Sequence, residues 1–238
     1  MLKSRVVIPL VLFIALSSSM SARNDELSQV KQSEDVIDAY KVCETFNHMM
    51  ADNLDFSAAF EATFVKDQNR RRAIAIKDRE FDSDLKVDDQ TLINAYKNRM
   101  QLLFSSLPLT SPDSKEQEEL FFPPRIKEIL ERQPPKDDQA FRRYEVQLEH
   151  DVIAFNQHLT HLVASNPAVA ERIRKFRAEA TGRDFKPPDG SIVEPLIDPY
   201  GGPVVKKNEP HYEINGFTVI REGAHMKIAG IQFFTRLF

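Results

Sequence analysis

The clearest pattern of apolar positions lies between Asp138 and Ser165. Apolar residues recur there at intervals of three or four: Phe141, Tyr144, Leu148, Val152, Phe155, Leu159 and Leu162. At about 100° per residue, these positions share one side of an α-helix. Asp137 or Asp138 can cap its first amides, and Asn166-Pro167 can end it and begin another. The pattern predicts a long helix with one buried face, followed by a second helix from Pro167 to Thr181.

Shorter stripes of the same kind predict helices earlier in the chain. Their expected ranges are Ser33 to about Ala51, a short helix capped by Asp55, Asp88 to about Phe104, and a helix broken at Pro123-Pro124 between Glu116 and Gln133. Aromatic residues at helical spacing, such as Phe56, Phe60 and Phe64, are more typical of a core than of a ligand site.

Arg70-Arg71-Arg72 forms a dense basic run. Such a run can bind an anion or an acidic surface, but it is usually a solvated helix face, which we expect here. The acidic residues Asp82, Asp84, Asp88 and Asp89 follow and could neutralise it. They do not fit a calcium loop, because Lys86 and Val87 occupy positions that need an oxygen ligand and a glycine.

Glycine divides the chain into two parts. All seven glycines lie at or beyond Gly182, where tight turns and bulges are needed. Residues 183–203 are a Pro/Gly-rich connector, and 204–238 have the β-branched and aromatic composition of strands. Asn215-Gly216 or Glu222-Gly223 can each form a tight turn, and we prefer the second as the main one. Gly230 inside the last strand predicts a bulge.

These elements predict an α+β protein with a mainly helical body and a small C-terminal antiparallel β-sheet. We expect a signal peptide in residues 1–22, a helical region in 23–182, the connector, and strands that pack on the helices as one domain. The chain has 238 residues, of which 42% are apolar and 29% charged, as in globular proteins. Its formal net charge of -4 argues against broad nucleic-acid binding.

The N-terminus has the features of a secretory signal. Lys3 and Arg5 precede the apolar run Val6 to Leu16, and a small-residue tail ends at Ala22. The run is shorter than the roughly 20 residues that span a bilayer, so we expect cleavage near Ala22 and no transmembrane segment afterwards. The expected location is therefore secreted or periplasmic.

Cys43 is the only cysteine, so the fold has no internal disulfide framework. It shares a helical face with Val36, Tyr40, Met50 and Leu54, which predicts a buried and unreactive thiol.

Three histidines lie on the long predicted helix. His150, His158 and His161 fall opposite its apolar stripe, which predicts exposure to solvent. His150 and His158 are roughly 12 Å apart by helix rise, and no carboxylate motif accompanies the pair His158 and His161. We therefore expect no metal site.

No known catalytic motif is present. His48, His211 and His225 are isolated in sequence, although a triad assembled in space is possible. The chain has no nucleophile elbow, no phosphate-binding glycine loop and no zinc-protease motif. The sequence thus assigns no catalytic residue and no cofactor.

Phe217-Thr-Val-Ile-Arg-Glu-Gly-Ala-His-Met-Lys-Ile-Ala-Gly-Ile231 resembles the last hairpin of NTF2-like domains, which are cone-shaped α+β folds. Phe46 to Phe64 is similar to their helical opening. The resemblance covers about a quarter of the chain and requires most of residues 69–188 to be a helical insertion. It implies a cavity between sheet and helices and identifies no functional residue.

The sequence therefore favours a non-enzymatic binding module for a small apolar ligand or a protein partner. The alternatives are a hydrolase-like enzyme that uses His and carboxylate groups assembled in the fold, and a structural envelope protein. A histidine within hydrogen-bond reach of Asp, Glu or Ser in a pocket would favour the enzyme.

Overall fold

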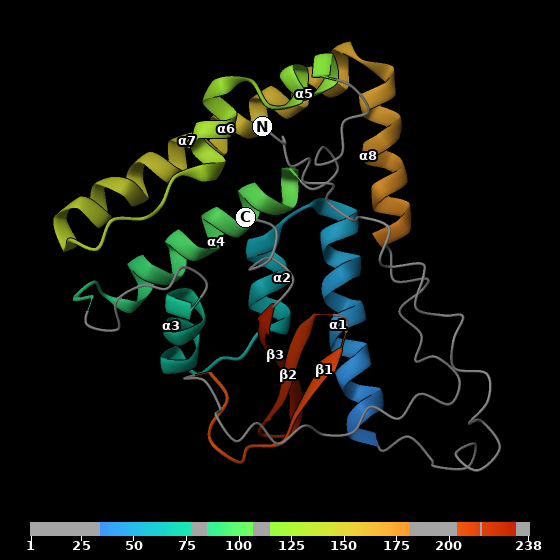
Figure 1. Ribbon diagram of the computed structural model, residues 1–238. Helices are drawn as coiled ribbons and strands as arrows, with labels where there is room; N and C mark the ends of the chain where they lie inside the picture. Colours follow the sequence, from blue (N-terminus) through green and yellow to red (C-terminus); the bar gives the residue numbers. More distant parts are fainter. Residues whose placement is uncertain (1–33, 78–84, 107–114, 181–203, 215, 232–238) are drawn as a thin grey trace, which may run out of the picture.

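A computed structural model describes residues 34–77, 85–106, 115–180, 204–214 and 216–231. In these ranges a series of α-helices precedes a three-stranded antiparallel sheet of order β1-β2-β3 (Figure 1). The predicted α+β class is therefore confirmed. The bounds of the elements are α1 (Glu34–Asn53), α2 (Phe56–Thr63), α3 (Gln68–Lys77), α4 (Asp89–Ser106), α5 (Lys115–Phe121), α6 (Pro124–Glu131), α7 (Asp138–Ser165), α8 (Pro167–Ala180), β1 (His211–Ile214), β2 (Phe217–Glu222) and β3 (His225–Ile231).

The helix starts follow the capping residues that the sequence predicts. Asp55, Asp88 and Asp137 each accept a hydrogen bond from the backbone N–H three residues further on, at 2.8–3.0 Å. Asn166 Oδ1 accepts one from Ala168 N at 3.1 Å, directly before α8. These caps satisfy amides that have no partner inside the helix. Ser33, where the first predicted helix begins, and Gly182 lie outside the described residues.

Both predicted hairpin turns are present. Gly216 and Gly223 have φ angles of 85° and 62°, which only glycine adopts without strain. The predicted bulge is also found, because Thr218 pairs with Gly230 whereas Val219 pairs with Ile228, which leaves Ala229 as the extra residue.

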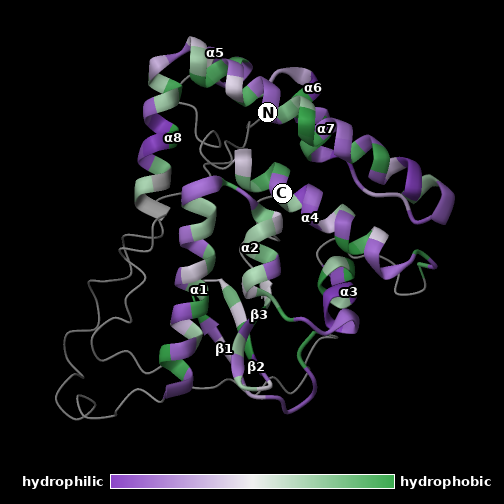
Figure 2. Cartoon of the chain, turned by 180° about the vertical axis from the view of Figure 1, so that it is seen from behind, coloured by the Kyte–Doolittle hydropathy of each residue, from purple (hydrophilic) through white to green (hydrophobic). Residues whose placement is uncertain are grey.

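The sheet packs against the first two helices. α1 contacts all three strands, and a short parallel bridge joins Phe64, after α2, to Ile228 in β3. Asp35 near the start of α1 pairs with Arg221 and accepts a hydrogen bond from the Tyr212 hydroxyl at 3.3 Å. Figure 2 shows hydrophobic residues where these elements meet and hydrophilic residues along α3 and α8.

Phe46 lies at the centre of the main core. Its ring centroid is 5.3–6.0 Å from four other phenylalanine rings, on α2, after α2, on α4 and on β2: Phe56, Phe64, Phe104 and Phe217. Phe46 is fully buried. One side chain of α1 therefore holds helices and sheet together through favourable aromatic contacts.

A second apolar cluster lies between α4, α5, α6, α7 and α8. Its buried members are Leu102, Phe121, Ile126, Ile129, Phe155, Leu162, Val169 and Ile173. The first half of α7 places Phe141, Tyr144 and Leu148 in the main core instead. The long helix thus has the predicted buried face, but it joins two cores and is not the centre of one.

We expect Phe46→Ala to reduce the free energy of unfolding by about 3–5 kcal/mol, because it removes a ring with four aromatic neighbours. The matched control is Val146→Ala, at a side chain 56% exposed on α7, which should change stability by less than about 0.5 kcal/mol. Urea denaturation measures both. Equal effects would show that Phe46 is not central.

Candidate functional site

The three consecutive arginines at the start of α3 anchor it to separate parts of the chain. Arg70 donates to both carboxylate oxygens of Glu209, at 2.7 and 2.9 Å, and Arg72 donates to Asp89 at 3.0 Å. The expectation of a solvated face is therefore wrong. Consecutive helical residues diverge by about 100°, so a run of three cannot remain on one exposed face.

Arg71 points into the protein and is 6% exposed. Its Nε donates to the Val65 carbonyl at 2.7 Å, and its Nη1 donates to the Glu61 carboxylate at 2.9 and 3.1 Å. The guanidinium carbon lies 4.8 Å from the centroid of the Phe60 ring. A buried cation is stable only when it is paired in this way.

Arg71 belongs to a group of charged residues that we call the Glu61 cluster. Its members come from α2, the α2–α3 loop, α3, α4 and the β2–β3 hairpin: Glu61, Lys66, Arg71, Lys97, Glu222 and Lys227. The cluster therefore lies where the helices meet the C-terminal sheet.

The cluster has a buried floor formed by Arg71 and Lys97, whose side chains are 7% and 12% exposed. Lys97 Nζ lies 2.7 Å from Glu61 Oε1 and 5.5 Å from the centre of the Phe60 ring. Among the described residues, Arg71 Nη2 has no hydrogen-bond acceptor although it is buried.

The rim of the cluster is open to solvent. The side chains of Lys66 and Glu61 are 53% and 46% exposed. Glu222 accepts hydrogen bonds from the backbone N–H groups of Lys66 and Asp67, at 2.7–3.0 Å. Lys227 Nζ donates to the Ala62 carbonyl at 2.9 Å. The hairpin is thus attached to the loop that leads into α3.

The pKa values of the cluster reflect its crowded charges. Burial alone would raise the pKa of Glu61, but hydrogen bonds from Lys97 and Arg71 outweigh it and hold that pKa below its ordinary value. Burial lowers the pKa of Lys227, and the positive charges of Lys66 and Arg71 lower it further.

The histidines of α7 are separated from other metal ligands. His150 and His161 are exposed as predicted. His158 differs from the prediction: it is half-buried, and its Nε2 is enclosed without a hydrogen-bond partner in the described residues. Within the described ranges, no three His, Cys, Asp or Glu side chains converge as a metal site would require.

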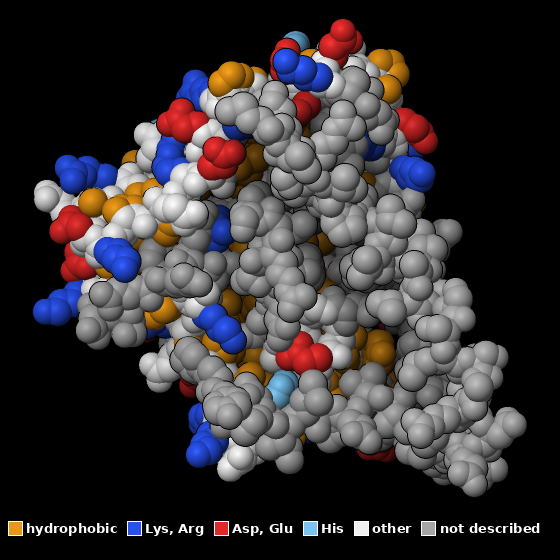
Figure 3. Space-filling model, in the orientation of Figure 1, with side chains coloured by type: hydrophobic (Ala, Val, Ile, Leu, Met, Phe, Trp, Pro, Cys, Tyr) orange, Lys and Arg blue, Asp and Glu red, His pale blue; other side chains and the backbone are white. Residues whose placement is uncertain are grey.

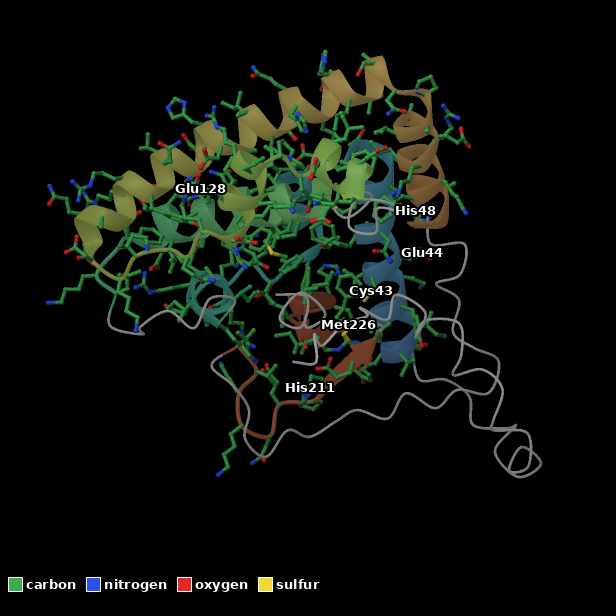
Figure 4. All side chains as sticks on the ribbon, turned by 45° about the horizontal axis from the view of Figure 1, so that its top comes forward. Cys43, Glu44, His48, Glu128, His211 and Met226 are labelled. Atoms are coloured by element: carbon green, nitrogen blue, oxygen red, sulfur yellow. The ribbon has the colours of Figure 1, made fainter. Side chains whose placement is uncertain are left out.

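Two histidines face a carboxylate. His48 Nε2 lies 3.7 Å from Glu44 on the same helix, and His211 Nε2 lies 3.9 Å from Glu213. Both distances exceed a normal hydrogen bond. Figure 4 shows His48 and Glu44 on α1, far from His211 at the start of β1. Each histidine therefore lies near one carboxylate, and the two pairs do not form a single site.

Cys43 is fully buried, as predicted. It lies near Met226 in Figure 4, and both belong to the core where α1 packs on β3. Burial raises the pKa of the Cys43 thiol, and the negative charge of Glu213 acts in the same direction. A protonated, enclosed thiol is a poor nucleophile.

Asp151 is a buried charge that the sequence analysis missed. It is 2% exposed on α7, where it pairs with Arg132 and accepts a hydrogen bond from Gln147 at 3.0 Å. Its position beside the apolar stripe of α7 is a sequence signal that could have identified it.

None of the described helices is long and apolar enough to cross a membrane.

Glu61→Gln should reduce the free energy of unfolding by about 1–3 kcal/mol. The expected loss of stability is smaller than for a fully buried ion pair, because Glu61 is half exposed and screened by solvent. The folded pKa lies below the unfolded value, so the stabilisation is complete above about pH 4.5 and is lost as the pH falls through the folded pKa. Unfolding measured from pH 3 to 7 should show this loss in the wild type and a smaller one in the variant.

The control is Asp38→Asn, which removes the exposed ion pair with Lys41 and should cost less than about 1 kcal/mol. If Glu61→Gln costs no more than this control, the carboxylate does not hold α2, α3 and α4 together.

Cys43 in the folded protein should react with a disulfide reagent at least roughly 100-fold more slowly than in urea, since labelling needs an opening of the core. Absorbance of the released thiolate at pH 8 measures both rates. Comparable rates would contradict the buried position.

Comparison with protein-family models, with curated proteins and with solved structures gave no match. The resemblance to NTF2-like domains therefore stays a prediction, and the function has to be inferred from the chemistry of the site itself.

Proposed function

We propose that the protein is a non-enzymatic, secreted or periplasmic binding protein for a small ligand or a protein partner. The observation that carries this proposal is the Glu61 cluster, in which the buried cations Arg71 and Lys97 lie beneath a rim that is open to solvent. Groups that suit catalysis are arranged differently: the Cys43 thiol is enclosed, and His211 lies 3.9 Å from Glu213.

A hydrolase-like enzyme is the second candidate, and His211 is the observation that favours it. The ring is 5% exposed, and its Nδ1 lies 3.3 Å from the Glu209 carbonyl, a contact that can orient the imidazole. However, the nearby Thr218 hydroxyl donates to Glu213 at 2.8 Å. The hydroxyl is thus engaged with the carboxylate, and we favour binding.

The resemblance to NTF2-like domains implies a cavity between sheet and helices. In this structure the contact between α1 and the sheet is packed with side chains such as Phe46, Cys43 and Phe217. The Glu61 cluster, whose rim is open to solvent, is therefore the better-supported contact point.

Native mass spectrometry of the full chain, produced in an exporting host, tests the proposal. We expect a mature N-terminus at Arg23 and an additional mass that disappears when the protein is denatured. An intact N-terminus would contradict export. A native mass equal to that of the protein alone would contradict tight binding of a small ligand.

A further inference from the structure

The Glu61 cluster contains more positive than negative charge. Four of its members are cations and two are carboxylates, which leaves two positive charges uncompensated within it. Glu61 is shared by three cations, since Lys97, Arg71 and Lys66 lie 2.7, 2.9 and 3.7 Å from its oxygens. One carboxylate cannot neutralise three cations.

Lys227 is affected by the same excess. Its pKa is lowered by burial first, and then by the positive charges of Lys66 and Arg71, although Glu222 opposes the effect. Burial alone lowers a lysine pKa, so only the part due to Lys66 and Arg71 reports the nearby positive charge. An anion at this position would relieve that repulsion.

A compact anion can approach the exposed rim, which lies above two buried cations. Arg71 and Lys97 supply donors from a floor that is nearly closed to water, and Lys66 and Lys227 supply ammonium groups near the rim. Arg71 Nη2 has no acceptor in the described residues, but it is closed to solvent, so it adds positive charge beneath the rim and does not itself contact the ligand. Guanidinium and ammonium groups together are the usual partners of phosphate and carboxylate oxygens.

On the face shown in Figure 3, the described residues do not form a broad basic surface. Along the edge formed by α5, α7 and α8, lysine, arginine and acidic side chains are interspersed (Figure 3). The whole chain has a formal charge of -4. These features favour a small anionic group over a nucleic acid, which needs an extended basic surface.

We propose that the Glu61 cluster binds the anionic group, a phosphate or a carboxylate, of the ligand that the proposed function requires. This proposal rests on the proposed function and names the chemistry of its ligand. Glu61 competes with the bound anion for Lys66 and Lys97, so its negative charge weakens the site.

Thermal unfolding at pH 7 tests the proposal, with sodium phosphate, sodium acetate and sodium chloride compared at equal ionic strength. Phosphate or acetate should raise the midpoint by about 3–6 °C relative to chloride, at roughly ten times the dissociation constant. The phosphate and acetate series distinguish the two ligand classes. Equal midpoints in all three salts would overturn the proposal.

Two lysine variants locate the effect. Lys66→Met and Lys227→Met keep the apolar stem of the side chain and should each lose most of the increase in midpoint that phosphate or acetate causes. The control Lys136→Met, at an exposed lysine before α7, should keep that increase. Because each midpoint is compared with the same variant in chloride, a change in basal stability does not affect the result. An equal rise in all three variants would show non-specific stabilisation and overturn the site.

Glu61→Gln gives a readout that a purely structural role would not. Removing the competing carboxylate should strengthen anion binding, so phosphate or acetate should raise the midpoint of this variant more than that of the wild type. A smaller rise would contradict the proposal. If native mass spectrometry finds a ligand that Lys66→Met and Lys227→Met both retain, the binding function stands and the anion site fails.

Discussion

The buried guanidinium of Arg71 is the constraint on which the arrangement of α2, α3 and α4 depends. A cation removed from water has to be surrounded by acceptors, and here these are the Val65 carbonyl and the Glu61 carboxylate. The carbonyl fixes the loop after α2. The carboxylate also binds Lys97, and so brings α4 to the same point. The Glu61 cluster is therefore structural before it is functional, and a ligand would bind to groups that the fold already holds in place.

The sheet adds a second constraint from the other end of the sequence. The Glu222 carboxylate accepts hydrogen bonds from the backbone N–H groups of Lys66 and Asp67. Arg221 forms an ion pair with Asp35. The hairpin thus contacts the beginning of α1 and the loop before α3. The cluster combines residues from both regions, so its charge balance exists only in the complete fold. This explains how a chain with a net negative charge can present a local positive site.

Much of the fold was predictable because local signals determined it. The stripe of α7, the caps Asp55 and Asp137, and the glycine turns depend only on neighbouring residues, and each agreed with the structure. The Glu61 cluster was not predictable, because its members lie far apart in sequence and meet only through tertiary contacts. Arg71 was misjudged since charge runs are usually solvated, a rule that fails when helical geometry turns the middle residue inward. His158 was misplaced because, at about 100° per residue, it lies beside the apolar stripe and not opposite it as His150 and His161 do.

The hydrogen bonds between the hairpin and the early part of the chain join residues 155 to 186 positions apart. Chain closure over such separations is slow compared with helix formation. During synthesis, α1 and α2 emerge long before β2 and β3. Phe46 is therefore made before Phe217, the ring on β2 that contacts it. The apolar face of α1 is therefore exposed on the growing chain until β2 and β3 have been synthesised. During that time chaperones and proteases can reach it.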